Sequence, residues 1–540
     1  MATLLCISLL CFIVGCLAVD PPVYKDTYRA EGFIRLPYAE IVEPFKAYLD
    51  TPNARSRVDY YGGTQRTIQY SKAQGLPYGT SLKIIPFSTQ SLYNQISCFQ
   101  VNGSSDAPSD LTTVIPDLTG FAYVGQDWID THHVNTYKKV VTDGKKTSTY
   151  TFWASADDLT PIRYEMMGYD SLMGSHYDKY YVDYTRWESP AAFTDEDFAV
   201  PDNLTCTSFP GPGAEHHIMM NPIREYVHHH DKHVHEAFEH FKRAHNKVYK
   251  DDEHDTRKHI FRQNLRFIHS KNRAGLTYTL AVNHLADRSE KEMKVMRGFR
   301  YTHGDHGGKK FSLMAMDKQD VPDQWDWRLQ GAVTPVKDQA ICGSCWSFGT
   351  VGTIEGANFL KTGNLIRLSQ QELVDCSWGF GNNGCDGGED FRAYNYIMQN
   401  GGLTSEEQYG QYLAIDGFCR SRVVQPVVQL ANFTTLPQGD LGALKLAIFN
   451  KGPVSVAIDA SHKSLSFYAN GVYYEPDCKN GPDDLDHAVL AVGYGTMNGQ
   501  DYWLVKNSWS TYWGNDGYVL MSQKDNNCGV ATDATFVEIK

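Results

Sequence analysis

The sequence lacks a long apolar segment beyond its first residues, and it also lacks a surplus of positive charge. Its 540 residues include 50 Lys and Arg against 63 Asp and Glu, so the net charge at pH 7 is −13. Such a chain is poorly suited to bind nucleic acid or an acidic membrane surface. No stretch after Val19 is long and apolar enough to span a bilayer. We therefore expect neither a nucleic-acid partner nor a membrane span.

The one long apolar run, Leu4 to Val19, lacks the Lys or Arg that usually precedes such a run in a signal peptide. It is short for a membrane span, and the small residues around Ala18 suit a cleavage site. We predict a secretory signal peptide at residues 1–18, with an N-terminal anchor as the alternative. Possible glycosylation sites at Asn102, Asn203 and Asn432 agree with export. We expect the secretory pathway, with a lysosomal or extracellular destination.

Cysteines are few enough to be counted individually. Three of the twelve lie in the predicted signal peptide, and nine remain. An odd number in an oxidising compartment indicates one free thiol. Cys342 and Cys345 form a C-x-x-C, a pattern shared by redox disulfides, half of a zinc site, and a structural cysteine beside a reactive one. The spacing alone leaves these possibilities open.

Residues 19–213 lack any grouping of catalytic residue types and have the pattern of an antiparallel β-sheet. Two β-rich runs flank Asp143-Gly144, which predicts a hairpin. Lys179 to Trp187 alternates with the period of a strand. We expect a curved sheet in which Cys98 is tied to Cys206, serving as an accessory or binding domain. Phe209-Pro-Gly-Pro-Gly213 marks its end.

Residues 226–300 differ in character, because Glu236 to Asn272 is highly charged and contains no Gly or Pro. This run is helical in period, and a generic amphipathic helix is one interpretation. Residues 301–320, rich in Gly, Lys and His, predict a flexible joint. From residue 321 the composition is again that of a compact domain. Six residues of the helical run fall on one stripe: Glu253, Arg257, Phe261, Asn264, Ile268 and Asn272.

Histidine is concentrated in one region, since fifteen of the twenty histidines lie between residues 216 and 306. A solvated linker is one interpretation. A zinc site from His229 and His233, at the i, i+4 spacing of a helix, is another. A third is a pH trigger, because an unperturbed histidine titrates near pH ~6.5. We expect no metal and no cofactor.

The residues after Cys345 have helical spacing, and Gly363 is a plausible end of that helix. Cys345 is thus predicted at a helix N-terminus, where partial positive charge lowers the pKa of a thiol. A hydrolytic thiolate also needs an imidazole and a group that orients it. His487 and Asn507, each within a strand-like run, form a suitable pair. The apolar positions of the helix are Phe348, Val351, Ile354 and Leu360.

These residues carry a resemblance to a known family. Gln339 followed by Cys345-Trp346-Ser347-Phe348 resembles the nucleophile segment of papain-like cysteine proteases. Asp486 to Val489 and Lys506 to Trp509 resemble that family's His and Asn segments. The stripe from Glu253 to Asn272 is similar to the inhibitory pro-helix of the cathepsin L group. Ala281 to Asp287 is similar to its second pro-segment motif, with Ala281 and Leu285 where Gly and Phe are commoner. The resemblance covers roughly residues 230–540.

The resemblance implies a helical pro-segment at 226–300, an activation joint at 301–320 and a two-lobed α+β peptidase domain at 321–540. One lobe would be helical and the other β-barrel-like. Cys345 would be the nucleophile, His487 the acid/base and Asn507 the group that holds the imidazole. Trp509 would shield that contact, and Gln339 would supply an oxyanion-hole side chain. Peptides and proteins would be the substrates, and the pro-segment the inhibitor.

Two other classes of protein remain as alternatives. One is an interaction protein with an inactive protease fold, which the presence of Gln339, Cys345, His487 and Asn507 disfavours. The other is a thiol–disulfide oxidoreductase, disfavoured because the family pattern assigns both cysteines elsewhere. The layout, with a β-rich region ahead of the pro-segment, is similar to the two-chain cathepsin L-like proteases of invertebrates. In those proteins the N-terminal chain is retained beside the catalytic one.

The family pattern implies a disulfide framework and a substrate pocket. Cys342 would pair with Cys385, Cys376 with Cys419 and Cys478 with Cys528, which leaves Cys345 free once Cys98 and Cys206 are joined. Asp533 would form the pocket floor and favour Arg as the second residue before the scissile bond. Ser510 and Tyr512 depart from the glycines common in that loop. The implied substrate-binding residues are Gly387, Gly388, Glu389, Asp390, Ala457, Asp486, Ala488, Trp509 and Asp533.

Overall fold

The structure, a computed structural model, describes residues 20–88, 94–172, 174–209, 221–229, 232–312 and 321–540. The predicted signal peptide at 1–18 and the last part of the predicted joint, 313–320, lie outside these residues. Contacts within the chain divide it into two units. The first holds residues 1–86 and 96–233, and the second holds 87–95 and 234–540.

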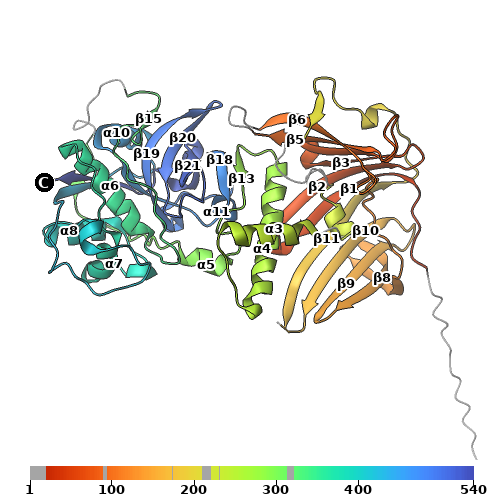
Figure 1. Cartoon of the computed structure of the whole chain (residues 1–540), viewed down its shortest axis with the longest axis horizontal. Coiled ribbons are helices and arrows are strands. Elements are labelled where there is room, and N and C mark those ends of the chain that lie inside the picture. Colours follow the sequence, from red (N-terminus) through yellow and green to blue (C-terminus); the bar gives the residue numbers. More distant parts are fainter. Residues whose placement is uncertain (1–19, 89–93, 173, 210–220, 230–231, 313–320) are drawn as a thin grey trace, which may run out of the picture. The chain divides into compact units, whose positions relative to one another are not determined.

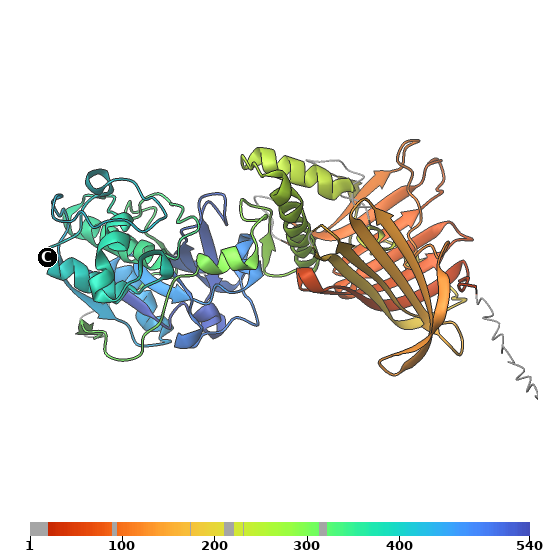
Figure 2. The ribbon, with the colours of Figure 1, turned by 90° about the horizontal axis from the view of Figure 1, so that it is seen from below.

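The first unit is built on one 12-stranded sheet that is strongly curved (Figure 1, Figure 2). The predicted hairpin is confirmed, because Asp143 pairs with Lys146 across Gly144, whose φ is +57°. Strand β12 runs parallel to β6, and the Cys98–Cys206 disulfide joins this pair. The strands in sheet order are β12 (Cys206–Ser208), β6 (Gln95–Asn102), β5 (Thr80–Phe87), β4 (Gln65–Tyr70), β3 (Arg55–Tyr60), β2 (Ile41–Asp50), β1 (Thr27–Leu36), β11 (Ser175–Glu188), β10 (Pro161–Asp170), β9 (Lys146–Ser155), β8 (His132–Asp143) and β7 (Ala122–Ile129).

One face of this sheet is buried, because alternate residues of β1 are shielded along its whole length. The segment around the short helix α2 (Arg224–Val227) packs into this unit, with Ile223 and Tyr226 buried. Two tyrosines bind its backbone. The Ile223 N–H donates to Tyr60 Oη at 3.0 Å, and Tyr180 Oη donates to the Tyr226 carbonyl at 3.0 Å. The unit is therefore completed by residues that follow the sheet in sequence.

The pro-segment contains two helices, α3 (Lys232–Ala244) and α4 (Asp251–Arg273), where the sequence predicted one run from 236 to 272. The break allows Phe238 and Phe241 of α3 to fold against Phe261 of α4, with ring centroids 5.3 and 5.0 Å apart. Burial of these rings outweighs the uninterrupted helical propensity. His229 and His233 do not share a helix, since α2 ends at Val227 and His229 has a φ of +54°.

The polar members of the predicted stripe hold the second half of the pro-segment, which comprises β13 (Tyr278–Leu280) and α5 (Glu290–Val295). Arg257 binds Glu292 with two nitrogens, at 2.7 and 2.8 Å. Asn264 Nδ2 donates to the Ala286 carbonyl at 2.9 Å. Asn272 exchanges two bonds of 2.8 Å with the Leu280 backbone. The stripe thus folds the pro-segment onto itself.

The remainder of the second unit has a helical part and a sheet part (Figure 1). Strand β13 of the pro-segment pairs with β18 at one edge of the sheet, and β14 (Lys309–Lys310) pairs with β16 at the other. Strand β15 (Trp325–Asp326) pairs with β19. The other elements are α6 (Cys345–Thr362), α7 (Gln370–Cys376), α8 (Asp390–Gln399), α9 (Glu406–Tyr409), α10 (Leu441–Lys451), α11 (Lys463–Ser466), β16 (Leu430–Thr435), β17 (Val454–Ile458), β18 (Tyr468–Tyr473), β19 (His487–Met497), β20 (Gln500–Lys506), β21 (Tyr518–Ser522) and β22 (Ala534–Ile539).

Helix α6 begins at Cys345 and ends before Gly363, whose φ is +74°, as predicted. Its glycines face the sheet part. An added Cβ would lie 2.6 Å from Ser455 Oγ at Gly349, 2.6 Å from Leu490 Cδ2 at Gly352, and 2.4 Å from Pro453 Cδ at Gly356. Only glycine allows this approach of the helix to the strands. The close contact places Cys345 beside the sheet.

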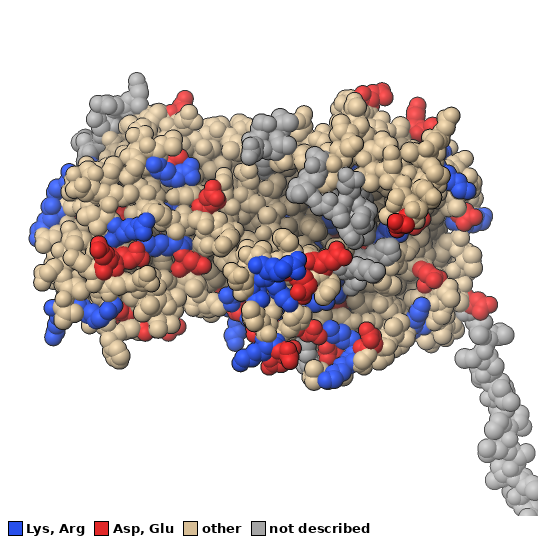
Figure 3. All heavy atoms as spheres, in the orientation of Figure 1, with Lys and Arg blue, Asp and Glu red and all other residues tan. Residues whose placement is uncertain are grey.

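The structure contains the disulfides Cys98–Cys206, Cys342–Cys385, Cys376–Cys419 and Cys478–Cys528, and Cys345 is the free cysteine of the described residues. Among the described residues, none of the helices has the length and apolarity needed to cross a bilayer. On the face drawn in Figure 3, basic and acidic side chains lie side by side rather than in separate fields.

We predict that Gly352→Ala lowers the free energy of unfolding by about 1–3 kcal/mol, because its Cβ would overlap Leu490. The matched control is Gly379→Ala, whose Cβ meets nothing within 4 Å. Urea unfolding of the full chain, followed by tryptophan fluorescence, measures both. Equal midpoints for the two variants would contradict the proposed role of the glycine face.

Candidate active site

Two elements of the second unit bring the predicted nucleophile and base into one site. Cys345 is the first residue of α6, and His487 is the first residue of β19; both side chains are fully buried. His487 Nε2 lies 2.8 Å from Asn507 Oδ1, an oxygen that also accepts the Ser508 N–H at 2.8 Å. The imidazole is therefore the donor in its bond to Asn507. Nδ1 remains as the nitrogen that can take a proton from a thiol.

Aromatic rings cover the imidazole–amide bond. The Trp509 ring centroid lies 4.8 Å from that of His487, and Trp513 contacts Trp509 edge to face at 5.4 Å. Both indoles are fully buried. A hydrogen bond shielded from water in this way is stronger and keeps the ring in one orientation.

Gln339 is held by its carbonyl oxygen, which leaves its amide nitrogen to donate. Its Oε1 accepts from Ser508 Oγ at 2.6 Å, and its backbone N–H donates to the Ser508 carbonyl at 2.8 Å. Nε2 donates to the Cys342 carbonyl at 2.7 Å and to the Met296 carbonyl of the pro-segment at 2.8 Å. A carbonyl of the pro-segment thus takes the bond that an oxyanion would require.

The pro-segment crosses the site in an extended conformation after α5. The Gly388 N–H donates to the Gly298 carbonyl at 2.9 Å, and the Arg300 N–H donates to the Gly388 carbonyl at 3.3 Å. The Phe299 N–H donates to the Asp486 carbonyl at 3.0 Å. Backbone bonds of this kind bind a chain regardless of its side chains.

Gly298 lies directly against the backbone of Gly343. A Cβ at this position would lie 1.8 Å from the Gly343 carbonyl oxygen, so only glycine fits. The neighbouring Arg297 forms an ion pair with Asp486 at 2.9 Å. Burial is the main cause that raises the pKa of Asp486 to about 6.

The covered site holds both reacting groups in their neutral forms. Burial raises the pKa of the Cys345 thiol to about 11 and lowers the pKa of His487 to about 4. Between these values neither a thiolate nor an imidazolium is favoured, because each would be a charge without water. Burial thus keeps water from Cys345 and His487 and disfavours the charged form of each.

The predicted pocket contains three neighbouring acids. The pKa of Asp533 is well above its ordinary value, because of burial and of the charges of Asp390 and Glu389. Asp390 accepts a bond from Thr535 Oγ1 at 2.5 Å. Glu389 is bound by Arg392 Nε at 2.8 Å and by the backbone N–H of Thr302 at 2.7 Å. Among the residues described here, Asp533 and Asp390 thus both lack a basic partner, whereas Glu389 has Arg392.

The structure brings most of the predicted pocket residues together. Ala457 pairs with Ala488 across β17 and β19, and both pack in one apolar cluster with Phe299. The Ala457 N–H donates to the Asp533 carbonyl at 3.0 Å. Gly387 and Gly388 border the pro-segment, and Trp509 lies on the imidazole side. Glu389, predicted in the pocket wall, is buried and carries an ion pair with Arg392.

Sequence reasoning overlooked two residues of this site. Ser508 orients Gln339, and Arg392 neutralises Glu389. Ser508 is the next residue after Asn507, so its place in the sequence could have indicated that it belongs to the site. Arg392 follows Glu389 by three residues at the start of a helix, a spacing at which side chains meet.

Comparisons with known proteins match two segments. Residues 321–538 match the family described as "Papain family cysteine protease", and residues 238–293 match "Cathepsin propeptide inhibitor domain (I29)". "Digestive cysteine proteinase 1" of Homarus americanus is 46% identical over 308 residues, which cover 56% of this chain and 94% of that protein. "Cathepsin L2" of Homo sapiens is 42% identical over 310 residues, 55% of this chain and 91% of that protein.

A solved structure agrees. Digestive procathepsin L 3 of the Tenebrio molitor larval midgut is 39% identical, with a TM-score of 0.52. The similarity covers 56% of this chain and 99% of that one.

We predict that Gly298→Ala opens the covered site, because its Cβ would collide with the Gly343 carbonyl. A strain of about 1–3 kcal/mol raises the population of the open form by about 5- to 150-fold. The rate at which iodoacetamide alkylates Cys345 in the uncleaved chain measures this population. Gly379→Ala, outside the cleft, should react like the parent, and equal rates for all three proteins would refute the prediction.

Proposed function

Because this chain belongs to the papain family of cysteine proteases and carries a cathepsin-type propeptide, we propose that it is the zymogen of an endopeptidase with Cys345 as its nucleophile. The peptidase is a hydrolase of EC 3.4.22 type, similar to cathepsin L. The observation that carries the assignment of residues is the His487–Asn507 bond of 2.8 Å, which leaves His487 Nδ1 for the thiol at the start of α6. An inactive binding protein would not need this arrangement.

The proposed reaction begins once the pro-segment has left the cleft. Water then reaches the site and favours the charged pair, so the Cys345 proton passes to His487. The thiolate attacks the substrate carbonyl carbon, and the oxyanion accepts bonds from Gln339 Nε2 and the Cys345 N–H. As the C–N bond breaks, His487 gives its proton to the leaving amine. Water, deprotonated by His487, hydrolyses the thioester and releases the acid. No cofactor is needed.

Location and processing are also proposals. Four disulfides and the exposed sequon residues Asn102 and Asn203 support folding in the secretory pathway, followed by a lysosomal or extracellular destination. Asn432 is only half-buried, although Thr434 of its sequon is buried. The domain limits are proposed as 1–18, 19–213, 226–300, 301–320 and 321–540. After processing, the β-rich N-terminal chain stays with the enzyme.

We predict that Cys345→Ala abolishes peptide hydrolysis without loss of the fold, because no other group can form the thioester. The comparison is Cys342→Ala, which breaks a disulfide at a cost of about 2–5 kcal/mol and should mainly lower stability. A fluorogenic peptide assay on protein freed of its pro-segment, with thermal unfolding alongside, separates the two effects. Hydrolysis by the Cys345→Ala protein would refute the assignment.

For specificity, we propose that Asp533 reads the second residue before the scissile bond. It lies with Ala457 at the base of the pocket and has no basic partner among the residues described, whereas Glu389 has Arg392. A substrate Arg would supply that partner through two hydrogen bonds. Leu would remain acceptable, because Ala457 and Ala488 give the pocket an apolar wall.

The preference for Arg over Leu should rise with pH. The pKa of Asp533 is raised in this pocket, so the group is a neutral acid at low pH and a carboxylate only above a pH higher than the ordinary ~4. We predict that the Arg-to-Leu ratio of kcat/KM increases as pH rises through that pKa. In Asp533→Asn the ratio should fall by about 10-fold or more and lose its pH dependence.

The control for long-range electrostatics is Asp483→Asn, which removes an exposed acid that pairs with His303. It should keep both the ratio and its pH dependence. If Asp533→Asn has the same ratio as the parent at every pH, Asp533 does not read the substrate.

A further inference from the structure

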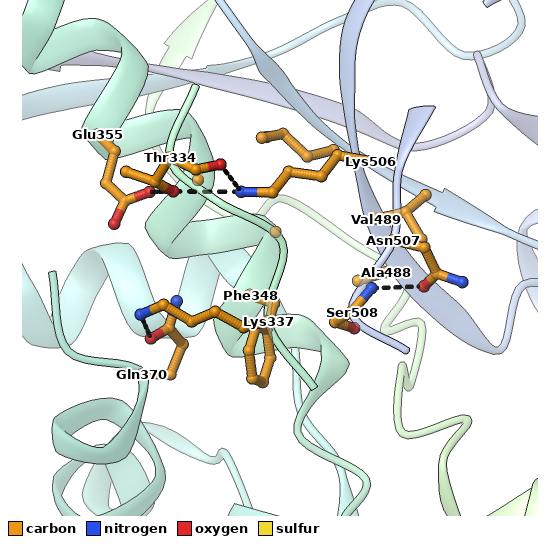
Figure 4. A pocket seen from close by; sticks show the side chains of 13 residues that line it. Thr334, Lys337, Phe348, Glu355, Gln370, Ala488, Val489, Lys506, Asn507 and Ser508 are labelled. Atoms are coloured by element: carbon orange, nitrogen blue, oxygen red, sulfur yellow. Dashed lines mark hydrogen bonds between the residues drawn. The ribbon is translucent and has the colours of Figure 1, made fainter. Parts of the chain in front are cut away.

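A small cavity lies next to the candidate site, with Asn507 and Ser508 among the residues that line it. Its volume is about 20 Å³, and it is bounded by α6 and by the adjoining ends of β19 and β20. Figure 4 shows the polar side chains around it, among them Thr334, Glu355 and Lys506. The proposed reaction uses none of these three groups.

The three groups form a chain of hydrogen bonds. Lys506 Nζ donates to the Thr334 carbonyl at 2.7 Å and to Thr334 Oγ1 at 3.2 Å. Thr334 Oγ1 in turn donates to Glu355 Oε2 at 2.6 Å, and Glu355 Oε1 accepts the Leu368 N–H at 2.9 Å. Thr334 and Glu355 are buried. The last residue of β20 is thereby tied to the middle of α6 (Figure 4).

The two residues that follow Lys506 each hold one group of the site. Asn507 binds the His487 imidazole at 2.8 Å, and Ser508 binds the Gln339 amide oxygen at 2.6 Å. The three consecutive residues therefore link the helix that carries Cys345 to the base and to the oxyanion donor. A shift of the end of β20 would move both at once.

We propose that Lys506 and Glu355 are positioning residues for the reaction, acting through Thr334 to fix Asn507 and Ser508 relative to α6. The inference rests on the proposed function. Burying opposite charges is a poor way to gain stability, because well-packed apolar residues of similar size often do as well. Hydrogen bonds are directional, so this chain fixes one position of the end of β20 relative to α6, which apolar packing would not do. A displacement of about 1 Å in such a site lowers the rate on the order of 100-fold.

A second lysine offers a matched control. Lys337 also borders the cavity, but its Nζ donates to Gln370 Oε1 at 2.7 Å and pairs with Glu406 at 3.1 Å. It precedes Gln339 by two residues, and within the described part of the chain its side chain binds Gln370 and Glu406 rather than β20. Removing its charge therefore tests a change of the same kind in the same cavity without loosening the strand.

The experiment compares Lys506→Met and Lys337→Met as full chains activated by removal of the pro-segment, with rates per active site titrated by a covalent thiol inhibitor. Lys506→Met should lower kcat by about 10-fold or more while KM changes by less than about 3-fold. Lys337→Met should leave kcat within about 2-fold. Adding Glu355→Gln to Lys506→Met should cause little further loss, because the chain is already broken.

If Lys506→Met does not fold, the variants Thr334→Val and Thr334→Ser test the proposal instead, again by kcat per titrated active site. The serine keeps the hydroxyl and should retain kcat, and the valine should not. A folded Lys506→Met, or a folded Thr334→Val, with a lower unfolding temperature but an unchanged kcat would overturn the proposal and leave the chain a structural role. Absence of peptide hydrolysis by the parent and by Lys337→Met would instead refute the proposed function.

Discussion

The close contact between helix α6 and the sheet is the constraint on which the site depends. The proposed nucleophile, Cys345, belongs to the helix and the proposed base, His487, to the sheet, so their separation is set by how near the two elements come. Gly349, Gly352 and Gly356 remove the side chains that would hold the strands away. Close packing of this kind is rigid, because neighbouring atoms leave no room for partial shifts. The hydrogen bonds from Lys506 through Thr334 to Glu355 also join the sheet to this helix, at the last residue of β20.

The pro-segment and the predicted joint pair with the two edges of this sheet, and the pro-segment also crosses the candidate site. Strand β13 of the pro-segment and strand β14 of the predicted joint occupy its two edges, which would otherwise expose unpaired backbone groups. Between them the extended residues around Gly298 cross the site, where the Met296 carbonyl binds Gln339. The proposed inhibition thus combines ordinary backbone bonds, a glycine without a side chain, and the removal of water from Cys345 and His487.

The site was more predictable from the sequence than the fold around it. Cys345, His487 and Asn507 stand out because catalysis requires those residue types, and Gly363 ends α6 as its backbone conformation demands. The break between α3 and α4 was not predictable from local pattern, because contacts between Phe238, Phe241 and Phe261 decide it. Likewise, the ion pair between Glu389 and Arg392 was found only in the structure. A local sequence pattern does not show which side chains will meet in the folded structure.

The disulfides close loops in two regions of the covalent chain, and the segment between these regions, residues 207–341, is an open thread. One loop runs from Cys98 to Cys206, and the other set lies between Cys342 and Cys528, so no cross-link begins or ends within residues 207–341. Any cut in that thread therefore separates the molecule into two covalent pieces, whatever the redox state of the surroundings. The pro-segment lies wholly on the thread. It can be excised without breaking a disulfide, and no covalent bond then joins the two remaining pieces.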